Sequence, residues 1–205
     1  MSESVIAVGQ DHFNDPNNYS DTITKVSNWK MFMWLFLAQD AMTFFTMFAA
    51  YLGLRISQYA TWPVPSSYLN IPKTAVMTFI LICSSVTMVQ ALAAIQRGDQ
   101  RKLRLWLSAT VLGGLLFLFG QYLEYSELIV HEHLSMGRSL FDATFFILTS
   151  FHGLHVLSGV IYLASVLAKA GRYTAQNYTQ VEIVGLYWHF VDLVWIILFT
   201  LVYLI

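Results

Sequence analysis

The chain has 205 residues, of which 57% are hydrophobic and only 11% are charged, and its formal net charge is −1. Soluble domains carry about 25% charged residues, so this chain has too few polar side chains to cover a globular surface. The composition therefore predicts a polytopic membrane protein. It gives no support to nucleic-acid binding, because no basic cluster with interleaved aromatic residues is present. The single cysteine, Cys83, excludes intrachain disulfides and thiolate metal clusters.

The first 28 residues differ in character from the rest of the chain. They are polar, they contain the turn-forming sequence Asp15-Pro16-Asn17-Asn18, and they lack the basic-then-apolar order of a signal peptide. We therefore expect a polar N-terminal tail over residues 1–28 and one membrane domain over residues 29–205. No internal repeat or low-complexity tract divides the domain further.

Five apolar stretches follow the tail, and each is long enough to cross a bilayer, which takes about 20 residues. They should be helical, because an isolated strand would leave its backbone groups without partners in lipid. The expected fold is therefore all-α, a polytopic membrane bundle of five transmembrane helices. The predicted spans are approximately 29–54, 72–96, 103–128, 140–168 and 181–205.

The basic residues are unevenly distributed between the two sides of such a bundle. The N-terminus and the second and fourth connections share one side, and this side holds 8 of the 11 lysines and arginines. Cytoplasmic segments are enriched in basic residues, so we expect the N-terminus inside and the C-terminus outside. Residues 97–104, which carry much of this charge, are expected to form a short inner turn. The eight are Lys25, Lys30, Arg97, Arg101, Lys102, Arg104, Lys169 and Arg172, and the other three are Arg55, Lys73 and Arg138.

Ionisable side chains also occur within the predicted spans. An Asp at the centre of a membrane helix costs about 2.5–3.5 kcal/mol on insertion scales, so each such group needs a protein partner or a water-filled cavity. In the third, fourth and fifth spans they form i, i+3 pairs, which lie on one face of a helix. The first span has a single acid, Asp40. The three pairs are Gln121 with Glu124, His152 with His155, and His189 with Asp192.

A metal centre is one interpretation of these histidines and carboxylates. Di-iron bundles use Glu-x-x-His within a helix, and no such element occurs here. We therefore favour the interpretation that the polar groups hydrogen-bond one another, backbone carbonyls or tyrosines. A bundle metalloenzyme would instead carry stoichiometric metal in the isolated chain. In the outer connection, His131-Glu132-His133 resembles a ligand cluster, although alternating residues of a loop face solvent as often as a metal.

Proton transfer is a second interpretation, with Asp40, Glu124 and Asp192 as carriers. The three acids lie at different depths, which disfavours a complete route, but Asp40 alone suits a place near a proton entrance in a partner subunit. A small transporter would use Asp40 and Asp192 as coupling acids and would need pseudo-symmetric halves with broken helices. Five spans do not divide equally, and the only proline in them, Pro72, lies at an end.

Four motifs resemble those of subunit III of the haem–copper respiratory oxidases, in its short five-helix bacterial form. Residues 151–156, Phe-His-Gly-Leu-His-Val, followed by Ser158-Gly159, resemble the fourth-helix signature of that family. Residues 187–195, Tyr-Trp-His-Phe-Val-Asp-Leu-Val-Trp, resemble its last-helix signature. Residues 121–125 match its glutamate-bearing motif, and Leu69-Asn70 precedes the second span as in the cytochrome c branch. The family often has Ser-Glu where this chain has Gln39-Asp40.

The resemblance implies an accessory core subunit without a catalytic, metal or cofactor site of its own. Haem and copper would lie in partner subunits. The chain would pack beside subunit I in a complex with subunit II, and possible further partners are small subunits or a respiratory supercomplex. It would bind phospholipid and support proton uptake, with Asp40 as the relevant acid, in a bacterial plasma membrane. The remaining polar residues would form a buried seam: Gln121, Glu124, His152, His155, His189 and Asp192.

The resemblance leaves the electron donor open. Quinol oxidases have a five-helix subunit III with related signatures, and a further relative accompanies nitric oxide reductases. Tyr187 and Leu69-Asn70 favour the cytochrome c branch. We therefore expect a subunit III of a proton-pumping cytochrome c oxidase, with a quinol oxidase subunit as the alternative and a small transporter as the less favoured one.

Overall fold

The computed structural model describes residues 27–59, 62, 70–130 and 139–204, which form helices and no β-strand. Five of the described helices are long and apolar enough to cross a membrane, so the predicted all-α fold with five spans is confirmed. A π-helical turn, η3 (Thr200–Leu204), prolongs the last of them, and a short 3-10 helix, η2 (Ala170–Arg172), precedes it. The long helices are α2 (Asn28–Ser57), α3 (Ile71–Gln96), α4 (Gln100–Val130), α5 (Leu140–Ala168) and α6 (Thr179–Phe199).

Three of the helices begin at a residue whose side chain caps the first turn. Ser27 accepts from the Lys30 backbone N–H at 3.3 Å, and Ser139 accepts from that of Asp142 at 3.0 Å. Asn70 caps α3 in the same way. Such caps satisfy backbone donors that have no partner within the helix, and they fix where each span begins.

The turn between α3 and α4 is shorter than predicted. The sequence indicated a loop over residues 97–104, but α4 begins at Gln100, so its first turn carries much of the basic charge. Gly98 makes the sharp turn possible with φ +75°, a backbone conformation open to glycine. The Asp99 carboxylate then accepts from the Lys102 backbone N–H at 3.1 Å, and this hydrogen bond lowers the pKa of Asp99.

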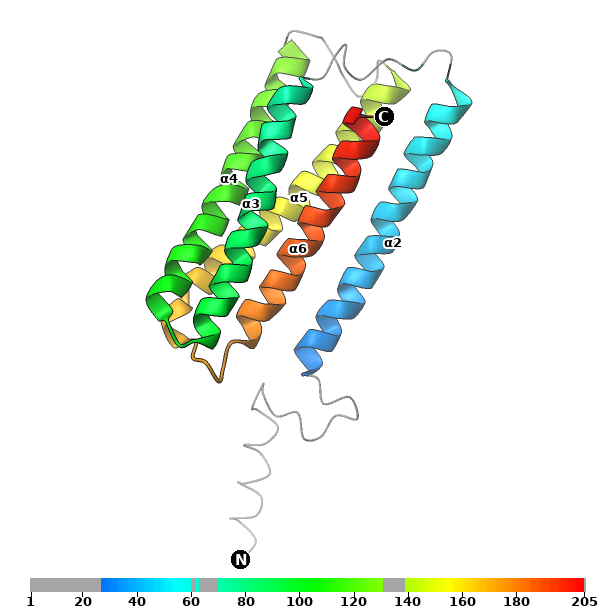
Figure 1. Cartoon of the computed structure of the whole chain (residues 1–205). Coiled ribbons are helices and arrows are strands. Elements are labelled where there is room, and N and C mark those ends of the chain that lie inside the picture. The colour runs from blue at the N-terminus through cyan, green and yellow to red at the C-terminus, as the bar shows by residue number, and fades with distance from the viewer. Residues whose placement is uncertain (1–26, 60–61, 63–69, 131–138, 205) are drawn as a thin grey trace, which may run out of the picture.

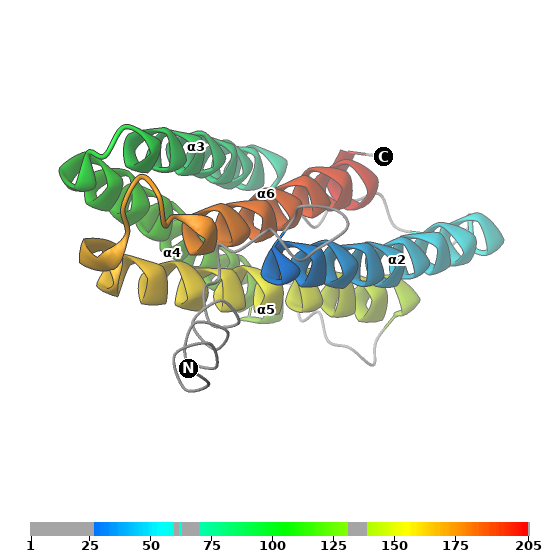
Figure 2. The same ribbon diagram turned by 90° about the horizontal axis from the view of Figure 1, so that it is seen from below.

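The helices form a layered bundle with α6 near its centre (Figures 1 and 2). Helices α3 and α4 pack closely as an antiparallel hairpin, and α4 also packs against α5. Helix α6 contacts α2, α3 and α5, whereas α2 packs mainly on α6 and more lightly on α5. The start of α2, the α3–α4 turn and the α5–α6 connection therefore lie at one end of the bundle, and the C-terminus lies at the other (Figure 1).

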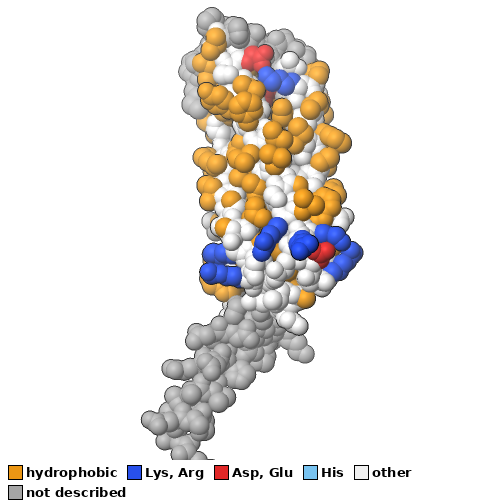
Figure 3. Space-filling model, turned by 90° about the vertical axis from the view of Figure 1, so that its left-hand side faces the viewer, with side chains coloured by type: hydrophobic (Ala, Val, Ile, Leu, Met, Phe, Trp, Pro, Cys, Tyr) orange, Lys and Arg blue, Asp and Glu red, His pale blue; other side chains and the backbone are white. Residues whose placement is uncertain are grey.

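The fold gathers the basic side chains at the end where α2 begins, which we call the basic end. Figure 3 shows them as a belt below a broad apolar surface. Of the described lysines and arginines, only Arg55 and Lys73 lie at the opposite end. The basic end carries Lys30, Arg97, Arg101, Lys102, Arg104, Lys169 and Arg172.

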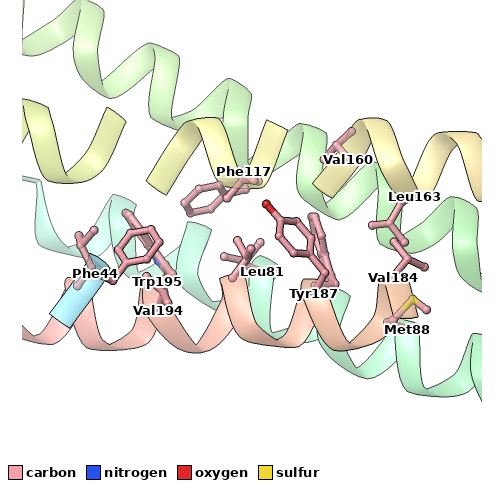
Figure 4. Packing of buried hydrophobic residues seen from close by; sticks show 14 of the residues in the cluster. Phe44, Leu81, Met88, Phe117, Val160, Leu163, Val184, Tyr187, Val194 and Trp195 are labelled. Carbon is pink, nitrogen blue, oxygen red and sulfur yellow. The ribbon is translucent and has the colours of Figure 1, made fainter. Parts of the chain in front are cut away.

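The core surrounds α6, and residues of all five long helices converge on it (Figure 4). One of its two fully buried tryptophans, Trp188, is 1% exposed and fits against two glycines of neighbouring helices. A Cβ atom added to Gly114 of α4 would lie 2.6 Å from the Trp188 ring, and one added to Gly159 of α5 would lie 3.0 Å from it. The Trp188 indole N–H donates to Ser84 of α3 at 3.1 Å. Small residues thus allow three helices to close on one indole.

We predict that Gly114→Ala destabilises the folded bundle by about 1–3 kcal/mol, because overpacking displaces the Trp188 and Val160 side chains. Thermal unfolding in a mild detergent, followed by circular dichroism, measures the effect. Gly153→Ala is the matched control, since nothing lies within 4 Å of an added Cβ at that helical position. Equal melting temperatures for the two variants would contradict the packing role of Gly114.

Candidate functional site

The structure distributes the seven polar residues singled out from the sequence over four groups. Gln121, Glu124, His152 and Asp192 are buried, whereas Asp40, His155 and His189 are partly buried. Two of the i, i+3 pairs stay together, but the histidines of the third have separate surroundings. Partners for most of these residues come from other helices, which spacing along the chain does not reveal.

The first group is a fully hydrogen-bonded carboxylate, Glu124 of α4. Thr74 of α3 donates to its Oε1 at 2.9 Å, and Tyr203 donates to its Oε2 at 3.1 Å. Gln121, one turn earlier, donates to the same Oε2 at 3.4 Å. The π-helical turn η3 carries Tyr203, so it joins the end of the α6 segment to the α3–α4 hairpin. Because both oxygens have donors and two of these donors come from α3 and η3, this group connects helices.

The second group pairs Asp40 of α2 with His155 of α5. Asp40 Oδ2 lies 3.2 Å from His155 Nε2, and the two side chains are 12% and 15% exposed. His155 Nδ1 lies 2.8 Å from the Phe151 carbonyl oxygen, which only accepts, so Nδ1 carries a proton. Asp40 Oδ2 makes no hydrogen bond among the described residues, so the two side chains meet as close ion-pair partners. Pairing a carboxyl group with an imidazole lowers the cost of placing both inside a membrane.

The third group contains the i, i+3 pair of α6, His189 and Asp192. His189 Nδ1 is 2.6 Å from the Ser85 hydroxyl of α3, and this hydroxyl also interacts with the Asp192 carboxyl group. Asp192 is 6% exposed, and its Oδ1 has no hydrogen-bond partner. The pair is thus held together by one serine, with hydrogen-bonding capacity left over.

The fourth site is His152 alone, which is completely buried. Neither of its ring nitrogens has a hydrogen-bond partner among the described residues. The ring stacks on Trp195 with a centroid distance of 4.9 Å and meets the Phe117 ring edge-on at 5.9 Å. His152 therefore packs as an aromatic side chain, which differs from the hydrogen-bonded role favoured from the sequence.

Metal-binding geometry is absent from the part of the chain that the structure describes: no three His, Cys, Asp or Glu side chains gather around a common point. The sequence His131-Glu132-His133 lies outside the described residues.

A pocket of about 570 Å³ opens at the basic end between α2, the end of α5 and the start of α6. Its rim combines two basic side chains, Lys169 and Arg172, with the rings of Trp29 and Tyr173. In the sequence, Lys169 and Arg172 served only to orient the chain. The pocket residues lie at the ends of the first, fourth and fifth spans in the sequence. Recognising them as one site would have required knowing that these three spans meet.

The comparisons with known proteins agree with this architecture. The model of the family described as cytochrome c oxidase subunit III matches residues 11–205. The chain belongs to this family. Cytochrome c oxidase subunit 3 of Corynebacterium diphtheriae is 39% identical over 175 residues, covering 83% of this chain and 85% of that protein. The Synechocystis protein of the same name is 42% identical over 177 residues, covering 83% of this chain and 73% of that protein. The Thermostichus vulcanus protein is 37% identical over 178 residues, covering 83% and 84% respectively.

Membership of the family confirms the resemblance drawn from the signature motifs. Subunit III is part of cytochrome c oxidase, an enzyme complex of the respiratory chain, so this multi-pass membrane chain belongs with other oxidase subunits. The family carries no redox centre of its own. The four polar groups are then features of a subunit inside a larger membrane complex.

We predict that Thr74→Val destabilises the bundle by about 1–2 kcal/mol. Valine has nearly the shape of threonine but no hydroxyl, so the buried Glu124 carboxylate loses one hydrogen bond. Thr43→Val provides the control, since the Thr43 hydroxyl is exposed and donates only to the Gln39 carbonyl of its own helix. Denaturant-dependent unfolding in mixed micelles compares the two variants. A Thr74→Val protein as stable as the Thr43→Val protein would exclude a stabilising role for the Glu124 group.

Proposed function

We propose that the chain is an accessory subunit III of a proton-pumping cytochrome c oxidase that stabilises subunit I and supports proton uptake without catalysing a step itself. Haem and copper would lie in partner subunits, and subunit II would complete the core. The family match over residues 11–205, on five spans of the expected length, is the observation that carries the proposal. The relatives are named for cytochrome c oxidase, which favours cytochrome c over quinol as the donor.

The proposed orientation places the basic end at the cytoplasmic face of a bacterial plasma membrane. Basic residues are retained on the cytoplasmic side during insertion, and seven of the described lysines and arginines lie at this end. The C-terminus would then be outside. The division into a polar tail over residues 1–28 and a membrane domain over residues 29–205 is part of the same proposal.

Support of proton uptake is assigned to the Asp40–His155 pair. Asp40 lies twelve residues from the start of α2, which corresponds to about 18 Å of helix from the basic end. The pair joins a carboxyl group to an imidazole, and its side chains retain some exposure at the edge of the bundle. A paired acid inside a membrane span suits a position beside the proton entrance of a neighbouring subunit.

Phospholipid binding is assigned to the pocket at the basic end. Lys169 and Arg172 supply positive charge for a phosphate group, and Trp29 and Tyr173 place aromatic rings at the depth of the headgroups. Phe32, Met33 and Ile183 continue the pocket with apolar side chains, which suit the glycerol backbone and upper acyl chains. A bound lipid there would also join α2 to the rest of the bundle.

We predict that the purified oxidase containing Asp40→Asn starts at a near-normal rate and loses activity faster over repeated turnovers, because the variant lacks the ionisable carboxyl group of the pair. Oxygen consumption with reduced cytochrome c follows both phases. The control is Asp142→Asn, a buried acid near the start of α5 at the opposite end. Decay indistinguishable from wild type would contradict the assignment, and consumption driven only by a quinol would identify the alternative oxidase class.

We predict that Lys169→Gln with Arg172→Gln reduces the phospholipid retained by the purified complex by about one molecule per chain, because the headgroup loses its positive partners. Lipid extraction and mass spectrometry of the washed complex measure it. Arg101→Gln with Lys102→Gln is the control, since both side chains are exposed at the same end and lie outside the pocket. Equal lipid content in both double variants would rule out this lipid site.

A further inference from the structure

Ser85, His189 and Asp192 form a polar group that shares no residue with the Asp40 pair or the basic-end pocket. His189 lies ten residues after the start of α6, and Ser85 lies fourteen after the start of α3. These spacings correspond to about 15 Å and about 21 Å of helix, so both residues lie near the middle of their spans. A polar group at that depth is remote from the headgroups on either side.

This group has hydrogen-bonding capacity that the described chain does not use. Asp192 is more than nine-tenths buried, and its Oδ1 has no partner. His189 uses Nδ1 for Ser85. Its Nε2 has no partner in the described part of the chain and is not among the enclosed atoms, so it opens to the surface between α3 and α6.

Exposed apolar side chains lie on the same two helices, within one or two turns of Ser85 and His189. Val89 of α3 is 51% exposed, and Leu193 of α6, one turn from His189, is 56% exposed. Ile82 and Ile196 extend the same surface along the two helices, with exposures of 39% and 43%. The α3/α6 face, defined by these four residues and His189, is therefore apolar with one imidazole nitrogen at its centre. Acyl chains can cover its apolar part, but they carry no group that hydrogen-bonds Nε2.

We propose that the α3/α6 face docks a transmembrane helix of another oxidase subunit, which presents a hydroxyl or carboxamide side chain to His189 at the bilayer centre. The inference rests on the proposed function, because it requires an oxidase complex. A hydroxyl or carboxamide can donate or accept, so it serves either tautomer of His189. Interhelical hydrogen bonds of this kind join membrane helices that have no hydrophobic driving force between them.

Photo-cross-linking in the intact, membrane-embedded complex tests the location of the interface. A benzophenone amino acid is placed at Val89 or Leu193, and at Phe119 of α4 as the control, which is 61% exposed on another helix. We expect positions 89 and 193 to yield an adduct with a second oxidase subunit and position 119 to yield mainly lipid adducts. Adducts at 89 and 193 that contain only lipid, or only a second copy of this chain, would overturn the proposal.

Substitution of His189 tests the hydrogen bond. We expect His189→Leu to weaken retention of the chain by the complex about threefold in a detergent titration, and His189→Gln to retain it nearly as well as wild type. Equal retention of the Leu and wild-type chains would overturn the role of His189. If the wild-type chain itself fails to co-purify with haem-containing subunits, the proposed function fails. If it co-purifies and the cross-links are absent, only the docking inference fails.

Discussion

Polar groups inside the bilayer have no water to bind, and this constraint determines how the five helices are joined. Several described ionisable groups in the spans have partners on another helix, whereas His152 is enclosed by aromatic rings and has no hydrogen bond among the described residues. Glu124 takes donors from α3 and from the π-helical turn after α6, and Asp40 meets a histidine of α5. The bundle is thus connected by a few polar contacts set into an apolar contact surface, with Trp188 as its tightly packed centre.

The same constraint distinguishes the polar groups by which of their atoms lack a hydrogen bond. The Glu124 oxygens have their donors, so that group is structural. In the Asp40–His155 pair, the carboxyl oxygen lies beside the imidazole without a hydrogen bond. Asp192 Oδ1 and His189 Nε2 also have no partner among the described residues, and they lie next to an apolar surface. The degree of hydrogen bonding therefore distinguishes the group that connects helices from the pair assigned to proton uptake and from the group proposed for docking.

The sequence was sufficient for the fold because the spans are long, apolar and separated by polar segments. Their predicted bounds lie within three residues of the observed helix ends, except where η3 continues α6. The α3–α4 turn was the main error, since the compact turn depends on the positive φ of Gly98 and the cap by Asp99. The candidate site was predicted less well. Spacing placed His189 and Asp192 on one face, but the link from Asp40 to His155 spans 115 residues and requires the packing of α2 on α5.

That long separation has a consequence for biosynthesis. Helix α2 enters the membrane first among the spans, but His155, the partner of Asp40, is synthesised 115 residues later. The partner of Lys30, Glu182, follows later still. At about 5–20 residues per second, Asp40 waits roughly 6–23 s before its partner exists. The α3–α4 hairpin, by contrast, is local and can close as soon as it is made. The nascent chain must therefore keep its first helix sheltered, at the translocon or beside another subunit, until its fourth and fifth spans arrive.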